Sequence, residues 1–270
     1  MKMKNKAIFA FATFSVTQTL CLTAFADEAD DLAKKLANPV AALISVPIQA
    51  NFDENIGANE QGSVLRINIQ PVIPVSISDD WNLISRTILP VIKQSDIPVA
   101  GAGESGLGDV LQSVFFSPKQ PSASGLIWGV GPVLLLDTAS DAALGGEKWG
   151  AGPTGVVLKQ DGAWTYGVLA NHVTSFAGED SRSDINATYV NPFVSFITQS
   201  KTTYGFNIEH TYDWEAEEPT TLVNLTANQL FKVGDQLLQV GGGFRYWTAS
   251  PDNGPHDLGF RLQLTLLFPK

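Results

Sequence analysis

Hydrophobic and polar residues alternate one by one along much of the chain, and the C-terminal segment illustrates the pattern. Residues 259–268 sort onto two faces: Phe260, Leu262, Leu264, Leu266 and Phe268 on one, and Arg261, Gln263 and Thr265 on the other, with Leu267 the one apolar residue on the polar face. A period of two predicts a β-strand with one apolar and one polar side. Such a strand fits a soluble sandwich with its apolar side inward, or a membrane barrel with its apolar side outward.

The same alternation predicts about twelve strands. They span residues 41–52, 63–77, 81–93, 106–117, 125–137, 149–159, 163–176, 187–198, 202–214, 220–232, 236–248 and 256–268. Residues 27–37 instead have helical spacing, because Leu32 and Leu36 share a face and the acidic residues precede Lys34 and Lys35, as the helix dipole prefers. Asn38-Pro39 ends this predicted helix.

The connections between the predicted strands alternate in length. Tight turns fall at residues 78–80, 160–162, 199–201 and 233–235, with a somewhat longer link at 118–124. Long polar loops fall near 53–62, 94–105, 138–148, 177–186, 215–219 and 249–255. Short turns at one end and long loops at the other are typical of outer-membrane β-barrels. An even strand count also places both chain termini at the short-turn, periplasmic end.

The tryptophans favour the membrane barrel over the sandwich. Three follow short turns and three lie beside long loops, as two aromatic girdles require: Trp81, Trp128 and Trp164 at one rim, and Trp149, Trp214 and Trp247 at the other. A soluble sandwich would gather tryptophans in mid-strand. We therefore predict an all-β, antiparallel up-and-down transmembrane barrel of about twelve strands with a short N-terminal helix.

Seven prolines fall inside the predicted strands: Pro47, Pro71, Pro74, Pro90, Pro132, Pro153 and Pro192. Each removes a hydrogen bond from the sheet ladder, and a closed barrel has no edge strand to hold it. We expect locally broken ladders there, with bulges or bends at Gly131-Pro132 and Gly152-Pro153. These bends either shape a constriction or are structural kinks alone.

The N-terminus has the form of a secretory signal. A basic start with three lysines is followed by an apolar run from Ala7 to about Ala24 and a small-x-small cleavage site near Ala26. Cleavage would remove the single cysteine, Cys21, and shift the net charge from −10 to about −13. Such a charge argues against a nucleic-acid partner. The chain then divides into a signal peptide (1–26), a helical periplasmic segment (27–39) and an outer-membrane barrel (40–270).

Several phrases are similar to a known family. Asn38–Pro47, Ile69–Pro74, Trp81–Pro90 and Trp149–Thr154 resemble outer-membrane transporters within the β-barrel group named after a meta-pathway of phenol degradation. The resemblance covers nearly the whole mature chain and implies an outer-membrane β-barrel of a Gram-negative bacterium. It brings no catalytic residue set and implies little about the solute.

Polar residues on the strands predict the lining of the lumen. Because an arginine facing lipid at the midplane costs roughly 2–4 kcal/mol, the charged side should face inward. The candidate lumen and solute-contact residues are Arg66, Asn68, Gln70, Arg86, Asn207, Glu209, Gln239, Arg245, Arg261 and Gln263. Such a ring either filters small solutes, including hydrophobic or aromatic ones, or forms salt bridges that fill the lumen of a non-transporting barrel with a structural or surface-interaction role. The helix is either a plug or, slightly favoured, a periplasmic segment.

No sequence pattern predicts an enzyme. Outer-membrane phospholipases pair a histidine with a serine two residues away, and none of the three histidines has one. We expect no catalytic residues, metal or cofactor. The long loops are acidic, which indicates solvated loops or a mouth that attracts cations. The expected partners are outer-membrane lipid and lipopolysaccharide, the barrel-assembly machinery and a small solute, with no nucleic acid.

Overall fold

The structure is a computed structural model that describes residues 31–234 and 236–268. The predicted signal peptide and its cleavage near Ala26 lie outside the described residues. A short helix spans residues 31–36. The strands are β1 (Ile44–Ile56), β2 (Gly62–Ile69), β3 (Val72–Ser76), β4 (Trp81–Ser95), β5 (Ser105–Leu107), β6 (Val110–Pro118), β7 (Leu126–Leu136), β8 (Lys148–Asp161), β9 (Trp164–Gly178), β10 (Asn186–Ile197), β11 (Thr202–Asp213), β12 (Glu218–Val233), β13 (Gln236–Ala249) and β14 (Asp257–Phe268).

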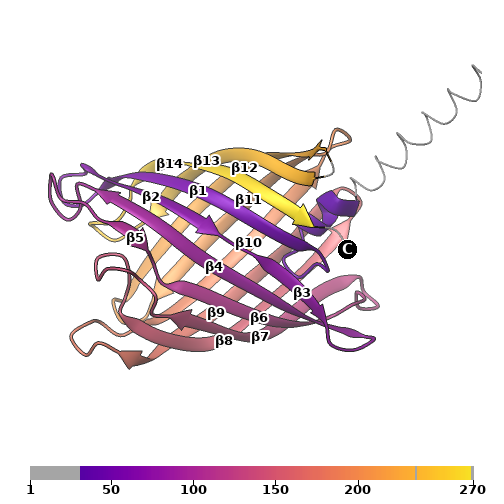
Figure 1. Cartoon of the computed structure of the whole chain (residues 1–270), viewed down its shortest axis with the longest axis horizontal. Coiled ribbons are helices and arrows are strands. Elements are labelled where there is room, and N and C mark those ends of the chain that lie inside the picture. The colour runs from indigo at the N-terminus through magenta and orange to yellow at the C-terminus, as the bar shows by residue number, and fades with distance from the viewer. Residues whose placement is uncertain (1–30, 235, 269–270) are drawn as a thin grey trace, which may run out of the picture.

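These strands form one closed antiparallel barrel (Figure 1). Each strand pairs with its neighbour in sequence order, and β14 closes the sheet on β1. Both β2 and β3 lie between β1 and β4, and both β5 and β6 pair with β4, so each of these two pairs occupies the place of one strand. The barrel therefore has twelve strand positions with two extra strand segments, which confirms the predicted fold.

Four of the seven strand prolines lie at an interruption of a ladder, as predicted, whereas the pairing of β3 with β4 runs without a break through Pro74. Pro71 falls in the gap between β2 and β3. At Gly131-Pro132 the pairing of β6 with β7 passes from Ser113–Val133 to Phe116–Val130. The β8–β9 pairing skips Gly152-Pro153 in the same way, and the β10–β11 pairing skips Pro192. Each of these gaps lies where a proline has no backbone N–H to donate to the ladder.

The two faces of the sheet have opposite chemistry. On β14, Leu262 is 70% exposed and points outward, whereas its neighbour Arg261 is 7% exposed and points inward. Phe244 and Phe260 contact each other on the outer face, with ring centroids 5.7 Å apart. An apolar outside and a polar inside are the reverse of a soluble sandwich, so the apolar face of the last strand belongs outside. In the described part of the chain, no helix has the length and hydrophobicity needed to span a membrane.

Five of the six tryptophans lie on the outward side of their strands. Trp81 and Trp128 contact edge to face at one rim, and Trp164 packs on Phe196. Trp149 and Trp214 are exposed toward the long-loop end. Trp247 is the exception. It faces the lumen, so its prediction as a girdle residue is wrong.

The N-terminal helix lies at the short-turn end of the barrel (Figure 1). Leu32 of the helix is buried in a cluster with lumenal leucines of β12, β13 and β14: Leu230, Leu237 and Leu267. The Lys34 carbonyl accepts a hydrogen bond of 2.8 Å from Gln160 Nε2. The interpretation as a periplasmic segment outside the barrel is therefore wrong, and the segment has the position of a plug. Leu267, the apolar exception on its strand, faces inward because it packs on this helix.

The chain after the helix continues through the lumen. Val40 is buried against inward-facing residues of β4, β6, β8 and β9, among them Ile84, Phe115 and Leu169. Residues 31–43 therefore fill the short-turn end of the barrel interior and form the floor of the space above them.

Candidate functional site

A lumenal cavity of about 590 Å³ lies above the N-terminal segment. Its floor includes Ala33, Leu36 and Pro39. A smaller cavity of about 120 Å³ lies beside it and shares Asn68, Glu209 and Arg261 with it. All ten predicted lumen residues line one or both cavities: Arg66, Asn68, Gln70, Arg86, Asn207, Glu209, Gln239, Arg245, Arg261 and Gln263. The two-residue period therefore identifies the inward face of these strands.

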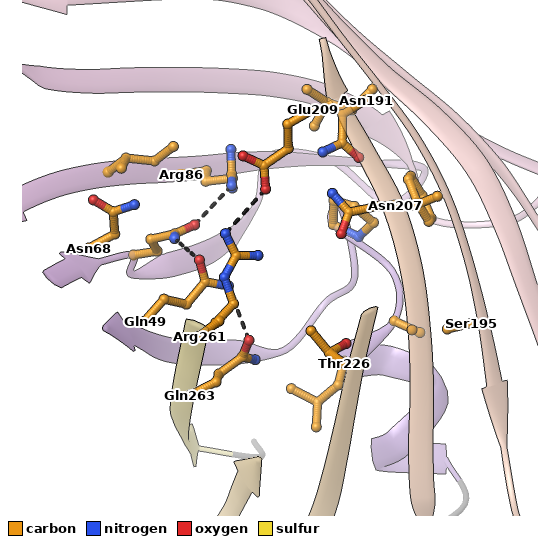
Figure 2. A pocket seen from close by; sticks show the side chains of 18 of the residues that line it. Gln49, Asn68, Arg86, Asn191, Ser195, Asn207, Glu209, Thr226, Arg261 and Gln263 are labelled. Atoms are coloured by element: carbon orange, nitrogen blue, oxygen red, sulfur yellow. Dashed lines mark hydrogen bonds and ion pairs between the residues drawn. The ribbon is translucent and has the colours of Figure 1, made fainter. Parts of the chain in front are cut away.

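A chain of hydrogen bonds runs along one wall of the large cavity (Figure 2). Arg86 Nη2 donates to Gln70 Oε1 at 2.9 Å, and Gln70 Nε2 donates to Gln49 Oε1 at 2.8 Å. Gln49 Nε2 then donates to Gln263 Oε1 at 3.1 Å. The chain crosses from β4 to β14 and holds the Arg86 guanidinium through a neutral amide.

A buried charged cluster lies beside this wall. Arg245 donates to both carboxylate oxygens of Asp53, at 3.0 and 3.2 Å, and to Asn51 Oδ1 at 2.9 Å. Arg261 donates from Nε to the same Asn51 oxygen at 2.6 Å and from Nη2 to Glu209 Oε1 at 3.2 Å. The cluster therefore joins β13, β14, β1 and β11 across the closure of the barrel.

Gly259 makes this cluster possible. It pairs with Arg245 and lies between β13 and β1, so Arg245 must reach across it to Asp53. A Cβ on Gly259 would lie 2.5 Å from Asp53 Oδ1 and 2.7 Å from the Phe52 carbonyl oxygen. Only glycine leaves room for the ion pair.

Two predictions about this region are wrong. Asp53 was expected in an acidic surface loop, but β1 continues to Ile56 and buries the Asp53 side chain to 8% exposure. Trp247 was expected in the outer girdle, but its Nε1 donates to Asp53 Oδ1 at 2.9 Å and its ring lies 5.7 Å from the Arg245 guanidinium carbon. An available signal was the continued alternation of Gln49, Asn51 and Asp53, which extends the polar face of β1 beyond residue 52.

Two lumenal arginines have no carboxylate partner among the described residues. Arg66 lines the small cavity, where its side chain is exposed, and no ion pair or side-chain hydrogen bond holds it. Arg86 lines the large cavity and donates a side-chain hydrogen bond to the neutral Gln70. Arg245 and Arg261, by contrast, are ion-paired with Asp53 and Glu209. Four arginines and two carboxylates line the cavities, which leaves an excess of two positive charges.

The lining of the large cavity is also partly apolar. Leu111, Leu169, Val173 and Phe193 contribute side chains from β6, β9 and β10, and Ile88 of β4 adds another beside Arg86. Four other residues that line the cavity carry a buried side-chain oxygen with no hydrogen-bond partner in the described structure: Asn68 Oδ1, Ser195 Oγ, Thr203 Oγ1 and Asn228 Oδ1. The cavity therefore combines an apolar wall, unsatisfied polar groups and an unpaired cation.

The loop at residues 137–147 folds over the long-loop end. Leu144 is buried against Val64 and Ile92, and Asp109 anchors the loop by accepting from the backbone N–H groups of residues 138, 139 and 146. Beyond it, Lys148 Nζ donates to Asp184 Oδ1 at 3.0 Å. This hydrogen bond, followed by one from Ser175, lowers the pKa of the Asp184 carboxyl. Both ends of the lumen are therefore narrowed by chain segments.

The histidines do not assemble a catalytic group. His172 and His210 lie on the outer face, where each Nδ1 contacts a threonine hydroxyl, that of Thr188 at 2.9 Å and that of Thr221 at 2.8 Å. Trp214 Nε1 donates to the same Thr188 oxygen at 2.8 Å. These contacts form a small polar patch on the outside of the barrel.

Comparison with known proteins supports the architecture. The chain is similar to a crystal structure of an outer membrane channel from Pseudomonas putida F1, with a TM-score of 0.66 and 15% sequence identity, over 84% of this chain and 96% of that one. It is less similar to the β domain of the Bordetella autotransporter Brka (TM-score 0.46, 13% identity, 83% and 99% coverage) and to Pseudomonas putida OprB (TM-score 0.38, 8% identity, 84% and 92% coverage). No family model and no curated protein matches the chain. At 15% identity, the likeness to the Pseudomonas putida F1 channel shows a shared barrel fold.

Proposed function

We propose that the chain is a narrow outer-membrane channel for small solutes, including solutes with a hydrophobic or aromatic part. The observation that supports this most is the cavity of about 590 Å³ inside a barrel whose outer face is apolar. A barrel with a merely structural lumen has no need of an open, partly polar cavity, because small barrels fill their interior with side chains. The similarity to an outer membrane channel agrees with this function.

The outer-membrane location and the partners belong to the same proposal. An apolar belt flanked by tryptophans fits the lipid bilayer and its lipopolysaccharide. The alternating last strand suits recognition by the barrel-assembly machinery. Membership of the outer-membrane transporter family in the phenol meta-pathway group is part of this proposal and rests on the similar sequence phrases.

A second function, a non-conducting structural barrel, is favoured by one observation. The N-terminal segment and the ion pairs Arg245–Asp53 and Arg261–Glu209 occupy much of the lumen. If the segment never leaves, the barrel carries no solute. Planar-bilayer recordings and liposome uptake of small solutes on the purified full chain distinguish the two.

Removal of the plug sharpens this experiment. A variant that lacks residues 31–39 should conduct several times more current than the full chain, because the floor of the cavity is then absent. Circular dichroism and heat-dependent mobility on gels control for folding of the shortened barrel. A folded, plug-deleted barrel without conductance or uptake would refute the channel function.

A further inference from the structure

We propose that the lumen selects organic anions, a carboxylate carried on an apolar body, and that Arg66 and Arg86 are the two successive groups that bind the carboxylate. The inference rests on the proposed channel function and specifies its substrate class. The observation behind it is the difference between paired and unpaired arginines in one lumen.

Paired arginines offer little to a passing anion. Arg245 and Arg261 direct their donors to Asp53, Asn51 and Glu209, so their charge is already compensated. Glu209 lines both cavities but is itself neutralised by Arg261 and bonded by Asn224 Nδ2 at 3.1 Å. The two lumenal carboxylates are therefore already paired with arginines. They repel an incoming anion less than two unpaired carboxylates would.

Unpaired arginines present donors and full charge to the cavities. A guanidinium is always protonated and matches a carboxylate with two parallel hydrogen bonds. Arg86 donates one hydrogen bond to Gln70, and no carboxylate among the described residues forms an ion pair with it. Arg66 is exposed to the lumen without an ion pair in the described chain. In a narrow pore with low-dielectric walls, such charges raise the local concentration of anions.

The two cations lie at different depths of the same wall. Arg66 pairs with Ile92 of β4, and Arg86 lies six residues farther along that strand toward the short-turn end. Six residues of strand correspond to about 20 Å. Asn68 lies between them in the chain and lines both cavities. A carboxylate can therefore pass from Arg66 in the small cavity to Arg86 in the large one.

The large cavity also accommodates an apolar body. Leu111, Leu169, Val173 and Phe193 line it together with Arg86. An inorganic anion would gain nothing from these side chains, whereas an aromatic or branched carboxylate buries its apolar part there. The acidic loops outside work against anion entry, but they are solvated and screened within about 8 Å at physiological salt.

The test uses the full chain in planar bilayers. Under a tenfold KCl gradient, the zero-current potential should have the sign of a chloride-permeable pore, and benzoate should reduce the chloride current where benzyl alcohol, of similar size and neutral, does not. Arg86→Gln should weaken benzoate block by roughly tenfold, the effect expected for losing a charge-assisted hydrogen bond. Arg66→Gln and the double variant should shift the zero-current potential away from the value of a chloride-permeable pore and toward that of a cation-permeable pore. Lys93 lies on the outer face of β4, the strand that carries Arg86. Lys93→Gln should leave both the zero-current potential and the benzoate block unchanged.

The outcomes separate the two proposals. A conducting pore that prefers cations, or one that benzoate and benzyl alcohol affect equally, would overturn the anion site and leave the channel intact. If the protein conducts nothing, the channel function fails, and the binding site is judged by titrating benzoate onto the detergent-solubilised protein. Saturable binding lost in Arg86→Gln would then support the site, and its absence would overturn it.

Discussion

Removal of the Asp53 carboxylate tests whether the charged cluster holds the barrel closed. The Arg245 and Asp53 side chains are 6% and 8% exposed, and Asp53→Ala leaves the Arg245 guanidinium in place without its carboxylate. The change also removes the bond from Trp247 Nε1. Breaking a buried ion pair from one side costs about 3–5 kcal/mol, and the neighbouring small cavity gives water some access, so we expect about 3 kcal/mol. This lowers the folded-to-unfolded ratio more than a hundredfold.

Urea unfolding of the barrel in phospholipid vesicles, followed by tryptophan fluorescence, measures this loss. Asp53→Leu combined with Arg245→Met should be far more stable than the sum of the single changes, because neither charge is left unpaired. Arg66→Met is the matched control and should change stability by no more than about 0.5 kcal/mol, since Arg66 is exposed to the lumen and unpaired in the described chain. A loss below about 1 kcal/mol in Asp53→Ala, or additive effects in the double variant, would refute this reasoning.

Four further predictions follow from single contacts. Gly259→Ala should destabilise the barrel because its Cβ meets Asp53, whereas Gly155→Ala, whose Cβ would make ordinary contacts of 3.6 and 3.7 Å, should not; urea midpoints compare the two. Leu267→Gln should loosen the helix from its lumenal cluster and speed tryptic cleavage at Lys34 and Lys35. The hydrogen bond from Lys148 should hold the pKa of the Asp184 carboxyl below its ordinary value of 3.8. The bond therefore stabilises the loop fully above pH 3.8, and this stabilisation is lost as the pH falls through the lowered pKa. Carbon NMR of Lys148→Met should show the Asp184 pKa return toward 3.8. Brominated lipids should quench Trp164, which is 51% exposed on the outer face, and leave the lumenal Trp247 unquenched when each is the only tryptophan.

Strand periodicity predicts the faces of this barrel well because a strand has only two sides. One correctly placed arginine, such as Arg261, fixes the orientation of every residue on its strand. The same local signal fails where an element meets a distant one. Arg245 meets Asp53 across 192 positions of sequence because β14 closes on β1, and periodicity carries no information about that register.

The other errors have the same physical origin. The sequence alone does not distinguish Trp247 from a tryptophan of the outer girdle. Its side chain faces the lumen, where Nε1 donates to Asp53. The short helix could bury Leu32 in several ways, and the lumenal leucines that receive it come from three strands near the other end of the chain. Leu267 was the local clue to this contact, because an apolar residue on an otherwise polar inward face requires an apolar partner inside the barrel.

The unequal pairing of the lumenal arginines argues for a function beyond closure of the barrel. This chain has 27 acidic residues against 17 basic ones, so carboxylates to neutralise two more arginines are not scarce. Yet only two carboxylates line the cavities, Asp53 and Glu209, and they are ion-paired with Arg245 and Arg261, whereas Arg66 and Arg86 have no ion pair among the described residues. An internal network that served stability alone would gain from completing these pairs, as it does for Arg245 and Arg261. Leaving two cations unpaired on one wall, above a floor that the N-terminal segment forms, is an arrangement that a transported anion would complete.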